Sequence, residues 1–420
     1  MSKKAHHIFG VLSWYGNSKV TQNAFVMKLA IVTDTFPPDV NGVAMTLQRL
    51  ASGLIGREHS VEVIHPGIQG LRGDEGGAGF AEVCVPGFAI PRYAFARIGW
   101  PRPVFLHRHW QDQRPDVIYL ATEGLLGYSA LRAARKLRVP VVSGYHTHFP
   151  QYLSNYHLGL LGPLLLRWLR KLHNSTACTL VPTEETRSLL VSQGFRNVEI
   201  MERGVDTELF HTNRRSREVR QRWGVEPGSP VLLYVGRIAA EKNLALVFEA
   251  WEFARAQCPA ARLVLVGDGP QRAHWAAKYP EAIWSGFLTG VDLAEAYASA
   301  DLLLFPSRTE TFGNVLLEAM ASSLPTVSYH LAASRRFIDP GHNGYAACGE
   351  SADAFLRQVI RALRERRRWT AMGGAARHSV ESQSWLQITR VFESWLMKTA
   401  GLHPSSLSNS AALLPIPLTA

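Results

Sequence analysis

The sequence predicts an α/β protein built from two doubly wound, Rossmann-like domains that face each other across a cleft. A chain of 420 residues is long enough for two domains. From Met27 onward, short apolar strands alternate with helical patterns, which is typical of parallel βαβ units. The alternation starts afresh after a charged stretch that follows residue 206. Two such domains in tandem favour a ligand held between them.

The first domain is expected over residues 27–206. It follows an irregular extension at 1–26, which has neither the apolar core nor the cleavage site of a signal peptide. Periodic apolar positions predict helices over 42–54 and 127–136. Short apolar runs bounded by turn residues predict the strands, which are KLAIVTD, SVEVIHP, DVIYLAT, PVVSGYHT, STACTLVPT and VEIMERGVD.

The second domain is expected over residues 207–383, beginning with the junction TELFHTNRRSREVRQRWGVEPGS. Helices are predicted over 245–256 and 293–298. Its predicted strands are PVLLYVGR, ARLVLVGDGP, AIWSGFL, DLLLFPS and PTVSYH. An amphipathic helix at 384–400 is placed to close the structure, and the Pro-broken segment 401–420 is expected to be a disordered tail.

The charge balance predicts an anionic partner. The formal net charge is +11 and the sequence pI is ≈ 9.7, which attracts nucleic acid, acidic lipid headgroups or phosphorylated substrates. The four cysteines form no C-x-x-C pair, so they fit neither a zinc site nor a disulfide framework and indicate a reducing cytosol. No run of about 18 apolar residues is present, so no membrane-spanning helix is expected.

The stretch ETFGNVLLE places two carboxylates, Glu310 and Glu318, around an apolar run. In one continuous helix they would lie ~12 Å apart along the axis and could not share one ligand atom. If the helix begins at Gly313 or Asn314, Glu310 lies on the loop before it, and the free N–H groups of its first turn lie between the two acids. A helix N-terminus binds anions. The stretch therefore fits a nucleotide sugar, although two glutamates near an apolar helix are also common without any function.

The motif VGRIAAEKN places Arg237 and Lys242 just after a strand, on the loop that enters a helix. A planar guanidinium and a flexible ammonium that converge on one point suit a diphosphate. The alternative is a solvated surface pair.

The motif TFPPDVNGVAMTL places Gly42 between the first strand and its helix, where a glycine lets the backbone approach a ligand closely. It is not G-x-G-x-x-G, and no acid ends the second strand, so a dinucleotide cofactor is disfavoured. His146 and His148 follow another strand in SGYHTHFPQYL. No carboxylate completes a metal site there, so contact with a sugar hydroxyl is the preferred interpretation, with a structural role as the alternative for His148.

Taken together, these motifs resemble family 4 glycosyltransferases, which are retaining enzymes of the GT-B fold that use nucleotide sugars. The resemblance covers roughly residues 27–398. Its segments are the NG after the first strand, HTxFPQYL, MERGVDTELF, VGRIAAEKN, VGDGP, AYASADLLLFPS and ETFGNVLLEAMASSLP. HTxFPQYL and RGVDTELF are most similar to the branch of GDP-mannose-dependent α-mannosyltransferases and sulfoquinovosyl-diacylglycerol synthases.

The resemblance implies a role for each matching position on the nucleotide side. Glu318 would bind the ribose hydroxyls. Arg237 and Lys242 would hold the diphosphate and stabilise its charge as it leaves. Gly42 would approach the β-phosphate from the N-terminal domain.

On the sugar side, the resemblance implies that Glu310 contacts the donor sugar. Backbone N–H groups of Phe312, Gly313 and Asn314 would lie near the sugar and phosphates, and His146 would touch the sugar near the reacting carbon. Such enzymes usually need no metal or other cofactor, which agrees with the missing D-x-D motif.

The sequence departs from the family pattern twice. The family often has Ser-Gly where this chain has Ser322-Ser323, which we expect to affect only packing. Many members have a Gly-Gly loop where this chain has HLAASRRF. That loop lies near the donor in the family, so the departure bears on which sugar is used.

Two stretches indicate which part of the protein meets the anionic partner. LLGPLLLRWLRKLH at 160–173 and PRYAFARIGWPRPVFLHRHW at 91–110 combine apolar or aromatic residues with Arg and His in the domain expected to hold the acceptor. They indicate docking on an anionic membrane surface. The alternative is a core helix with a solvated basic edge. No recognised nucleic-acid module is present, so a nucleic-acid partner is not expected.

The sequence therefore predicts a retaining, metal-independent hexosyltransferase. We expect it to move mannose from GDP-mannose to a membrane lipid or glycolipid, in the cytoplasm and peripherally on the inner face of the cell membrane. Two alternatives remain open: a UDP-sugar-dependent enzyme acting on diacylglycerol or a soluble glycan, and a catalytically idle nucleotide-sugar-binding protein. A Rossmann oxidoreductase is disfavoured because its fingerprint is absent.

Overall fold

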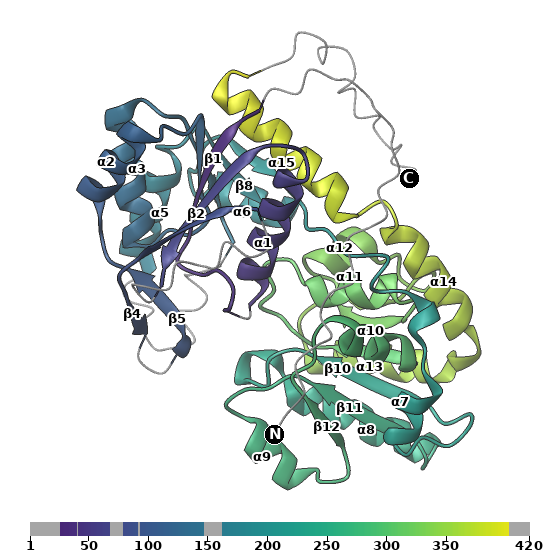
Figure 1. Cartoon of the computed structure of the whole chain (residues 1–420). Helices are drawn as coiled ribbons and strands as arrows, with labels where there is room; N and C mark the ends of the chain where they lie inside the picture. Colours follow the sequence, from purple (N-terminus) through teal and green to yellow (C-terminus); the bar gives the residue numbers. More distant parts are fainter. Residues whose placement is uncertain (1–25, 40, 68–78, 91–92, 147–161, 403–420) are drawn as a thin grey trace, which may run out of the picture.

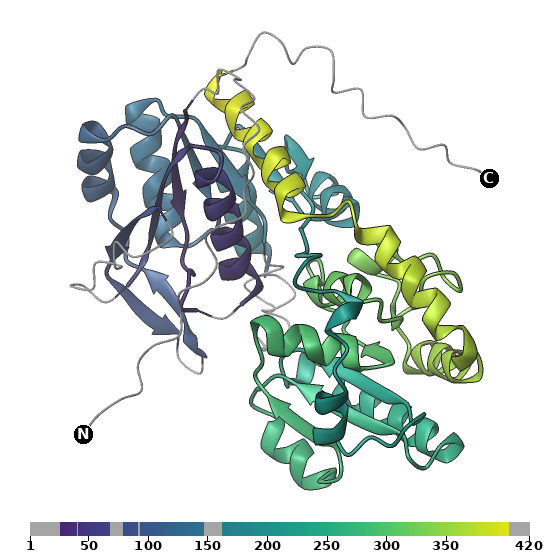
Figure 2. The same cartoon turned by 45° about the vertical axis from the view of Figure 1, so that its right-hand side comes forward.

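The computed structural model describes residues 26–39, 41–67, 79–90, 93–146 and 162–402. The chain forms two lobes, with the N-terminal elements in one and the elements from α7 to α14 in the other (Figures 1 and 2). The expected N-terminal extension up to residue 25, the tail from 403 and His148 lie outside the described residues.

The N-terminal domain is organised around a seven-stranded, all-parallel sheet with the order β3-β2-β1-β6-β7-β8-β9. Central strands such as β6 are buried along their whole length because helices cover both faces of the sheet. The strands are β1 Lys28–Val32, β2 Ser60–Pro66, β3 Ala81–Val85, β6 Val117–Leu120, β7 Val141–Gly144, β8 Cys178–Val181 and β9 Val198–Ile200.

Helices α1 (Gly42–Ile55) and α15 (Trp385–Ala400) share one hydrophobic cluster on one face of this sheet. Helices α2 (Pro103–Asp112), α3 (Leu125–Leu137) and α5 (Gly162–His173) pack on the other face. Helix α6 (Glu184–Ser192) joins α5 around a smaller cluster at β8 and β9.

The C-terminal domain has a six-stranded parallel sheet with the order β12-β11-β10-β13-β14-β15. Its strands are β10 Val231–Val235, β11 Arg262–Val266, β12 Ile283–Gly286, β13 Leu302–Phe305, β14 Thr326–Tyr329 and β15 Tyr345–Ala347. Helices α8 (Leu244–Gln257) and α13 (Ala352–Arg364) cover one face, and α10 (Gly290–Ser299) and α11 (Asn314–Ala321) cover the other.

Shorter elements complete this domain, and α14 contributes to the clusters on both faces of its sheet. They are η2 Thr212–Arg214, α7 Arg217–Arg222, η3 Ala240–Lys242, α9 Arg272–Lys278, α12 Ala333–Phe337, η4 Arg366–Arg368 and α14 Trp369–Val380.

Two chain segments cross between the domains side by side. The segment after β9 leads into the C-terminal domain, and the segment after α14 leads back to α15. They are joined by a bond from Val205 N–H to Gln383 O of 2.8 Å and by a bridge between Val205 and Ser384. Helix α15 thus begins at the crossing and ends on the N-terminal domain, against α1 (Figure 1).

Most of the predicted strands and helices are found within a few residues of their expected positions. The strand predicted from VEIMERGVD is only three residues long, Val198–Ile200. Four strands were not predicted: β3, the antiparallel hairpin of β4 (Gly87–Ile90) and β5 (Tyr93–Gly99), and β15. No helix in the described part of the chain combines the length and the apolar composition needed to cross a membrane.

Candidate active site

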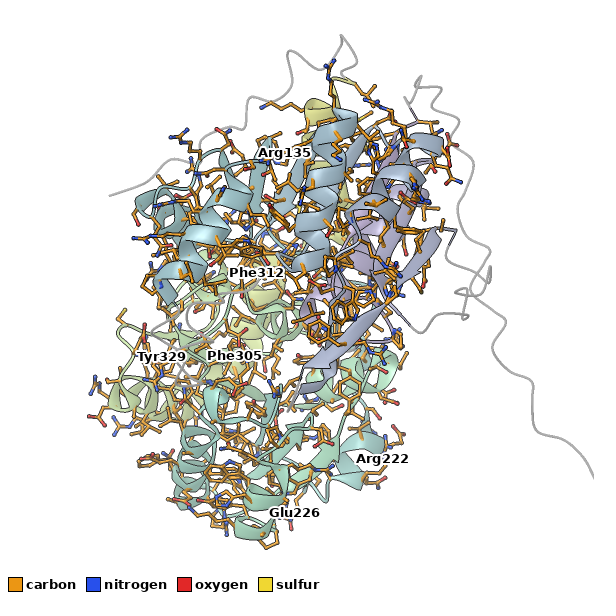
Figure 3. All side chains as sticks on the ribbon, turned by 90° about the vertical axis from the view of Figure 1, so that its left-hand side faces the viewer. Arg135, Arg222, Glu226, Phe305, Phe312 and Tyr329 are labelled. Carbon is orange, nitrogen blue, oxygen red and sulfur yellow. The ribbon has the colours of Figure 1, made fainter. Side chains whose placement is uncertain are left out.

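Helix α11 begins where the sequence predicts it. Gly313 is the N-cap with φ 101°, a left-handed conformation that favours glycine, and Asn314 is the first helical residue. Glu310 lies on the preceding loop and Glu318 lies inside the helix. Phe312 is buried, and Figure 3 shows it near the boundary between the two lobes. The two acids are therefore separated by the start of a helix, as expected.

The N-termini of two helices meet between the domains. A methyl group added at Gly42, the first residue of α1, would lie 3.9 Å from Asn314 Nδ2, at the first residue of α11. Asn41 caps α1 by accepting hydrogen bonds from Val43 N–H (3.0 Å) and Ala44 N–H (2.9 Å). Since each helix directs the positive end of its dipole to its N-terminus, both helices favour negative charge in the same region.

A charge pair lies beside α11. The Lys242 ammonium contacts a carboxylate oxygen of Glu310 and lies 3.3 Å from Ser307 Oγ. Burial alone would raise the pKa of Glu310, but the charge and hydrogen bond of Lys242 outweigh it, so this pKa is lowered and Glu310 is ionised at neutral pH. In this state Lys242, expected on a diphosphate, is held by the acid expected on the sugar.

The loop that carries Arg237 and Lys242 is fixed by neighbouring strand ends. Asn243 donates from Nδ2 to Pro306 O (2.9 Å), which ties this loop to the end of β13. Ile238 N–H donates to Asp268 O (2.9 Å) in the VGDGP turn after β11. Arg237 lies 3.4 Å from the carboxylate of Glu241. Both cations of the motif therefore lie at the carboxyl end of the sheet, where ligands bind in such folds.

Glu318 accepts a hydrogen bond of 2.8 Å from the Tyr297 hydroxyl. Burial raises the pKa of Glu318, against the opposing effects of that hydrogen bond and of Arg49. Arg49 belongs to α1 and also forms an ion pair of 3.4 Å with Asp206 at the domain crossing. The positive charge of Arg49, in the N-terminal domain, therefore acts on Glu318, the carboxylate that is expected to bind the ribose.

His146 follows β7 by two residues and is 6% exposed. Its Nε2 lies 2.8 Å from the Tyr119 hydroxyl and its Nδ1 lies 2.8 Å from Arg203 Nη2. Burial lowers the pKa of His146, and the charges of Arg203 and His173 lower it further, so the ring is neutral. Both ring nitrogens are bonded within the protein in this state, and neither is open to a sugar hydroxyl.

One group of three side chains in the described part of the chain could hold a metal ion. It consists of His65, Glu82 and Cys84, whose ligand atoms lie within 4.8 Å of one another on β2 and β3. This group belongs to the N-terminal sheet, whereas Lys242 and Glu310 belong to the C-terminal domain.

Both departures from the family pattern fall on left-handed backbone. Ser323 has φ 57° and Ala332 has φ 49°, conformations that a glycine adopts without strain. The Ala332 N–H donates to the Glu185 carboxylate (2.9 Å), which also pairs with Arg335. Because Glu185 lies in the first turn of α6 in the N-terminal domain, the HLAASRRF loop contacts the other domain through it. No sequence signal pointed to Glu185.

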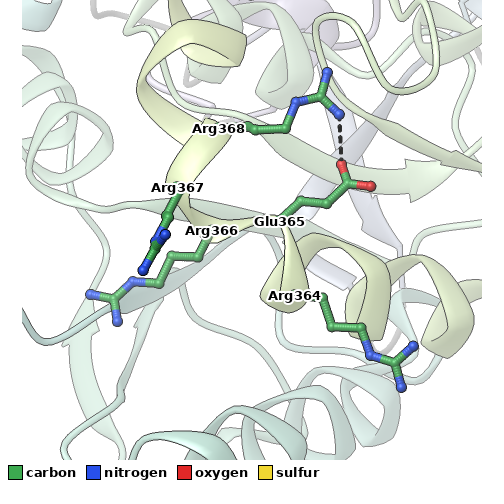
Figure 4. A pocket seen from close by; sticks show the side chains of 5 residues that line it. All are labelled: Arg364, Glu365, Arg366, Arg367 and Arg368. Carbon is green, nitrogen blue, oxygen red and sulfur yellow. Dashed lines mark hydrogen bonds and ion pairs between the residues drawn. The ribbon is translucent and has the colours of Figure 1, made fainter.

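A basic surface hollow lies elsewhere on the C-terminal domain. It has a volume of ≈ 740 Å³ and is lined by arginines around one acid (Figure 4): Arg364, Glu365, Arg366, Arg367 and Arg368. Glu365 is paired with Arg361 and Arg368. The hollow contains none of the residues predicted for the nucleotide site, so its depth alone does not make it the active site.

Comparison with known proteins identifies the family. The model of Glycosyltransferase Family 4 matches residues 40–209, and that of Glycosyl transferases group 1 matches residues 229–365. The chain is 34% identical to the GDP-mannose-dependent alpha-mannosyltransferase of Mycobacterium tuberculosis, over 86% of this chain and 93% of that protein. It is 32% identical to sulfoquinovosyl transferase SQD2 of Arabidopsis thaliana, over 66% of this chain and 55% of that protein.

Among solved structures, Anabaena HepE in complex with UDP and glucose superposes with a TM-score of 0.69 at 18% identity, over 88% of this chain and 99% of that one. At this identity the match shows the fold, which is GT-B. The two family models and the 34% identity agree with the motifs: the chain belongs to glycosyltransferase family 4 and is a glycosyltransferase that uses a nucleotide sugar.

Proposed function

We propose that this protein is a retaining, metal-independent hexosyltransferase that moves mannose from GDP-mannose to a membrane lipid or glycolipid. The observation that carries the proposal is the meeting of the N-termini of α1 and α11 beside the pair Lys242–Glu310. Two helix dipoles and an ammonium together favour a dianionic group such as a diphosphate. The similarity to GDP-mannose-dependent alpha-mannosyltransferases at 32–34% identity supports mannose and guanosine.

In the proposed reaction, the diphosphate leaves with its charge stabilised by this chain. Arg237 and Lys242 hold it, and Gly42 lets the backbone of the N-terminal domain approach the β-phosphate. Lys242 exchanges one anion, Glu310, for another, the phosphate, and so releases Glu310 to accept hydrogen bonds from the sugar. The free-energy cost of separating Lys242 from Glu310 is limited, because neither charge is left buried without a partner.

The remaining donor contacts lie along α11 and across the cleft. Backbone N–H groups of Phe312, Gly313 and Asn314 approach the sugar and phosphates, and Glu318 accepts hydrogen bonds from the ribose hydroxyls. In this proposal the acceptor attacks on the face from which the diphosphate departs, and a phosphate oxygen takes the acceptor's proton. The sugar therefore keeps its configuration without a nucleophilic side chain.

A lipid acceptor is supported by the surface of the N-terminal domain. Among the described residues, large apolar side chains are exposed there on β4, α2, α3 and the loops beside them: Phe88, Trp100, Val104, Phe105, Leu125 and Tyr128. The rings of Phe88 and Trp100 are in contact, with centroids 5.4 Å apart, although Trp100 is 52% exposed. An exposed apolar patch with aromatic rings suits the interface of a bilayer.

The basic helix α5 lies on the same face of the sheet as α2 and α3. Arg167, Arg170 and Lys171 are exposed on it, and Leu164 is 65% exposed. His173, which the sequence suggests as part of the basic edge, is instead buried against Glu123. An apolar patch beside a basic helix fits an anionic lipid surface, and we place the protein peripherally on the cytoplasmic face of the cell membrane.

A donor screen tests the proposal. GDP and GDP-mannose should raise the melting temperature of the protein more than UDP and UDP-sugars do, because only a bound ligand stabilises the native state. The product made with a lipid acceptor should carry an α-linked hexose by NMR. A larger shift with UDP would favour the UDP-sugar-dependent alternative. Donor binding without any transfer would favour the idle binding protein.

Metal independence is tested in the same assay. Since Arg237, Lys242 and the two helix N-termini supply positive charge, we expect full activity in excess EDTA. Loss of activity in the chelator, restored by a divalent ion, would contradict this part of the proposal.

A further inference from the structure

Three side chains from distant parts of the chain form a buried hydrogen-bonded chain with His146 in the middle. Tyr119 comes from β6, His146 follows β7, and Arg203 follows β9 at the domain crossing. They are 0%, 6% and 4% exposed, respectively. His146 lies between the other two, 2.8 Å from each.

The chemistry of arginine fixes where the proton of this imidazole lies. A guanidinium has only donors, so Arg203 Nη2 donates and His146 Nδ1 accepts. A neutral imidazole carries one proton, which must then be on Nε2. That N–H points to the Tyr119 oxygen.

Arg203 occupies a costly position for a purely structural residue. Burial lowers its pKa to about 10, which still leaves it charged at neutral pH. Among the described residues no carboxylate pairs with it, and its Nη1 has no hydrogen-bond partner. A buried guanidinium without a counter-charge destabilises a fold, whereas an apolar side chain would not. The hydrogen bond to His146 is the contact that Arg203 makes from this buried position.

The space around the network is also specific. A methyl group added at Gly144, at the end of β7, would overlap both the Tyr119 hydroxyl and His146 Nε2. On its other side, the Tyr119 ring packs edge-on against Phe392 of α15, with centroids 4.8 Å apart. Tyr119, which bonds His146, is therefore itself fixed by its contacts with Gly144 and Phe392.

We propose that Arg203 is a positioning residue that fixes His146 as the Nε2–H tautomer, so that His146 can donate a hydrogen bond to a substrate oxygen but cannot remove a proton. The contact between His146 and the substrate rests on the proposed function, whereas the tautomer of His146 does not. The substrate oxygen would replace the Tyr119 hydroxyl as the acceptor of the Nε2 proton. His146 thereby becomes a neutral donor toward the sugar or its phosphate.

The charged and titratable groups that face His146 act in the same direction. Arg203 and His173 of α5 both disfavour a second proton on the ring, and burial does so most strongly. Tyr119 is neutral because burial raises its pKa, which Glu123 raises further and Arg203 opposes. From helix α15, the apolar ring of Phe392 packs against Tyr119. The imidazole should therefore stay neutral throughout the range in which the enzyme works.

The test is nitrogen NMR on the full chain labelled with ¹⁵N-histidine, in which the signals missing from His146→Asn identify His146. In the wild type we expect an unprotonated Nδ1, a protonated Nε2 and no titration between about pH 6 and 8. In Arg203→Met, which keeps the length but loses the donor and the charge, His146 should populate both tautomers, while burial keeps the ring neutral. Arg203→Lys, which keeps a donor and a charge, should restore the wild-type tautomer.

Kinetics give a second readout. Arg203→Met should lower kcat at saturating donor on the order of 10–100-fold, the cost of a misplaced group, with a smaller change in KM. Arg220→Gln is the structural control. Arg220 is partly buried and bonds Asp301 and the carbonyl oxygens of Ser299 and Ser229 in the C-terminal domain, so its loss should leave the His146 signals unchanged.

A protonated Nδ1 in the wild type would overturn the proposal, and this measurement needs only His146→Asn for the assignment and no substrate. His146 signals that are unchanged in a folded Arg203→Met would overturn it as well. Failure of the donor screen would reject the proposed function and leave the tautomer result standing.

Discussion

At the scale of single residues, the site is held in a resting arrangement by its own charges. Lys242 pairs with Glu310, and Glu318 is bonded by Tyr297. Lys242, Glu310 and Glu318 therefore already have partners within the C-terminal domain. Donor binding would exchange these partners for ligand atoms, so that no charge is left isolated.

Lys242→Ala and Arg237→Ala should each lower kcat at saturating donor by ~10²-fold or more. The charge on the leaving diphosphate is greatest in the transition state, so cations that hold it act mainly on the chemical step. Arg255→Ala is the matched control, because Arg255 is an exposed arginine of α8 that pairs with Glu281. A kcat within threefold of the wild type in both site variants would remove these residues from the site.

The pair Ser322 and Ser323 gives a stability prediction. Ser323 is left-handed (φ 57°), whereas Ser322 is not (φ −80°). Ser323→Gly should raise the free energy of unfolding by roughly 0.5–1 kcal/mol because it relieves backbone strain. Ser322→Gly should lower it by a similar amount because only the entropic effect of glycine remains. Denaturant unfolding of the two variants checks the sign, and equal effects would contradict the strain argument.

The sequence could predict some of these residues and not others. The start of α11 depends on local signals, so the separation of Glu310 and Glu318 could be predicted from nine residues. The partners of His146 could not, because Tyr119 and Arg203 lie 27 and 57 residues away along the chain. The left-handed backbone at Ser323 and Ala332 was hidden because neither residue is a glycine.

At the scale of elements, the C-terminal helix α15 packs on the N-terminal domain and is bonded to residues near its first strand and helix. Its Glu393 receives hydrogen bonds from Arg57 (2.7 Å) and from buried His59 (2.6 Å), both at the end of α1. His59 Nδ1 in turn accepts from Met27 N–H (3.2 Å), just before β1. One carboxylate therefore joins α15, the loop after α1 and the segment that enters the first strand.

Glu393→Gln should lower the free energy of unfolding at neutral pH by about 2–3 kcal/mol, the value of hydrogen bonds to a charged group. Burial alone would raise the pKa of Glu393, but bonds from His59 and Arg57 lower it below its usual value of 4.5. The stabilisation should therefore be complete above the unfolded pKa and be lost as the pH falls through the lower folded pKa.

Unfolding curves of wild type and Glu393→Gln should thus differ at pH 7 and converge in acid. Glu381→Gln is the control, since Glu381 follows α14 and has an exposed side chain, so its loss should have little effect at either pH. A difference that persists unchanged at pH 3 would contradict the assignment to the ionised Glu393.

Element prediction succeeded where a strand is buried on both faces. Strands such as β6, β10 and β13 are continuous apolar runs, the pattern of a covered parallel sheet. It failed for β3 at the sheet edge, where AEVCV carries a charged residue and is only partly buried. Strand β5 falls within the stretch 91–110 that the sequence indicates as aromatic and basic, and it pairs only with β4, outside the main sheet.

At the scale of the whole molecule, polar contacts join the two domains in the part of the chain that the structure describes. Arg49 pairs with Asp206, Glu185 with Arg335 and Glu202 with Arg336. Interfaces of this polar kind permit relative movement of domains. The N-terminal domain carries the apolar patch and α5, whereas the C-terminal domain carries Lys242, Glu310 and Glu318. Docking on a membrane and binding of the donor can therefore be separated by mutation.

Vesicles rich in anionic lipid should bind this protein, and raised salt should release it. Each Lys or Arg near an anionic surface contributes ~1 kcal/mol. Replacement of Arg167, Arg170 and Lys171 by glutamine should therefore weaken vesicle binding on the order of 10²-fold in low salt. Affinity for the donor nucleotide should be unchanged, because its proposed site is in the other domain. Sedimentation with vesicles of varied composition measures the first quantity, and calorimetry measures the second.

A control of equal charge separates local docking from the effect of net charge. Arg357, Arg364 and Arg367 are exposed in or after α13 of the other domain, and Arg364 and Arg367 line the hollow of Figure 4. Their replacement by glutamine removes the same three charges, so a protein attracted only by its overall charge of +11 would lose binding equally in both triple variants. If the N-terminal domain docks, only the α5 variant should lose it. Equal sedimentation of the wild type with neutral and anionic vesicles would instead mean that α5 has a solvated basic edge and that the acceptor need not be a lipid.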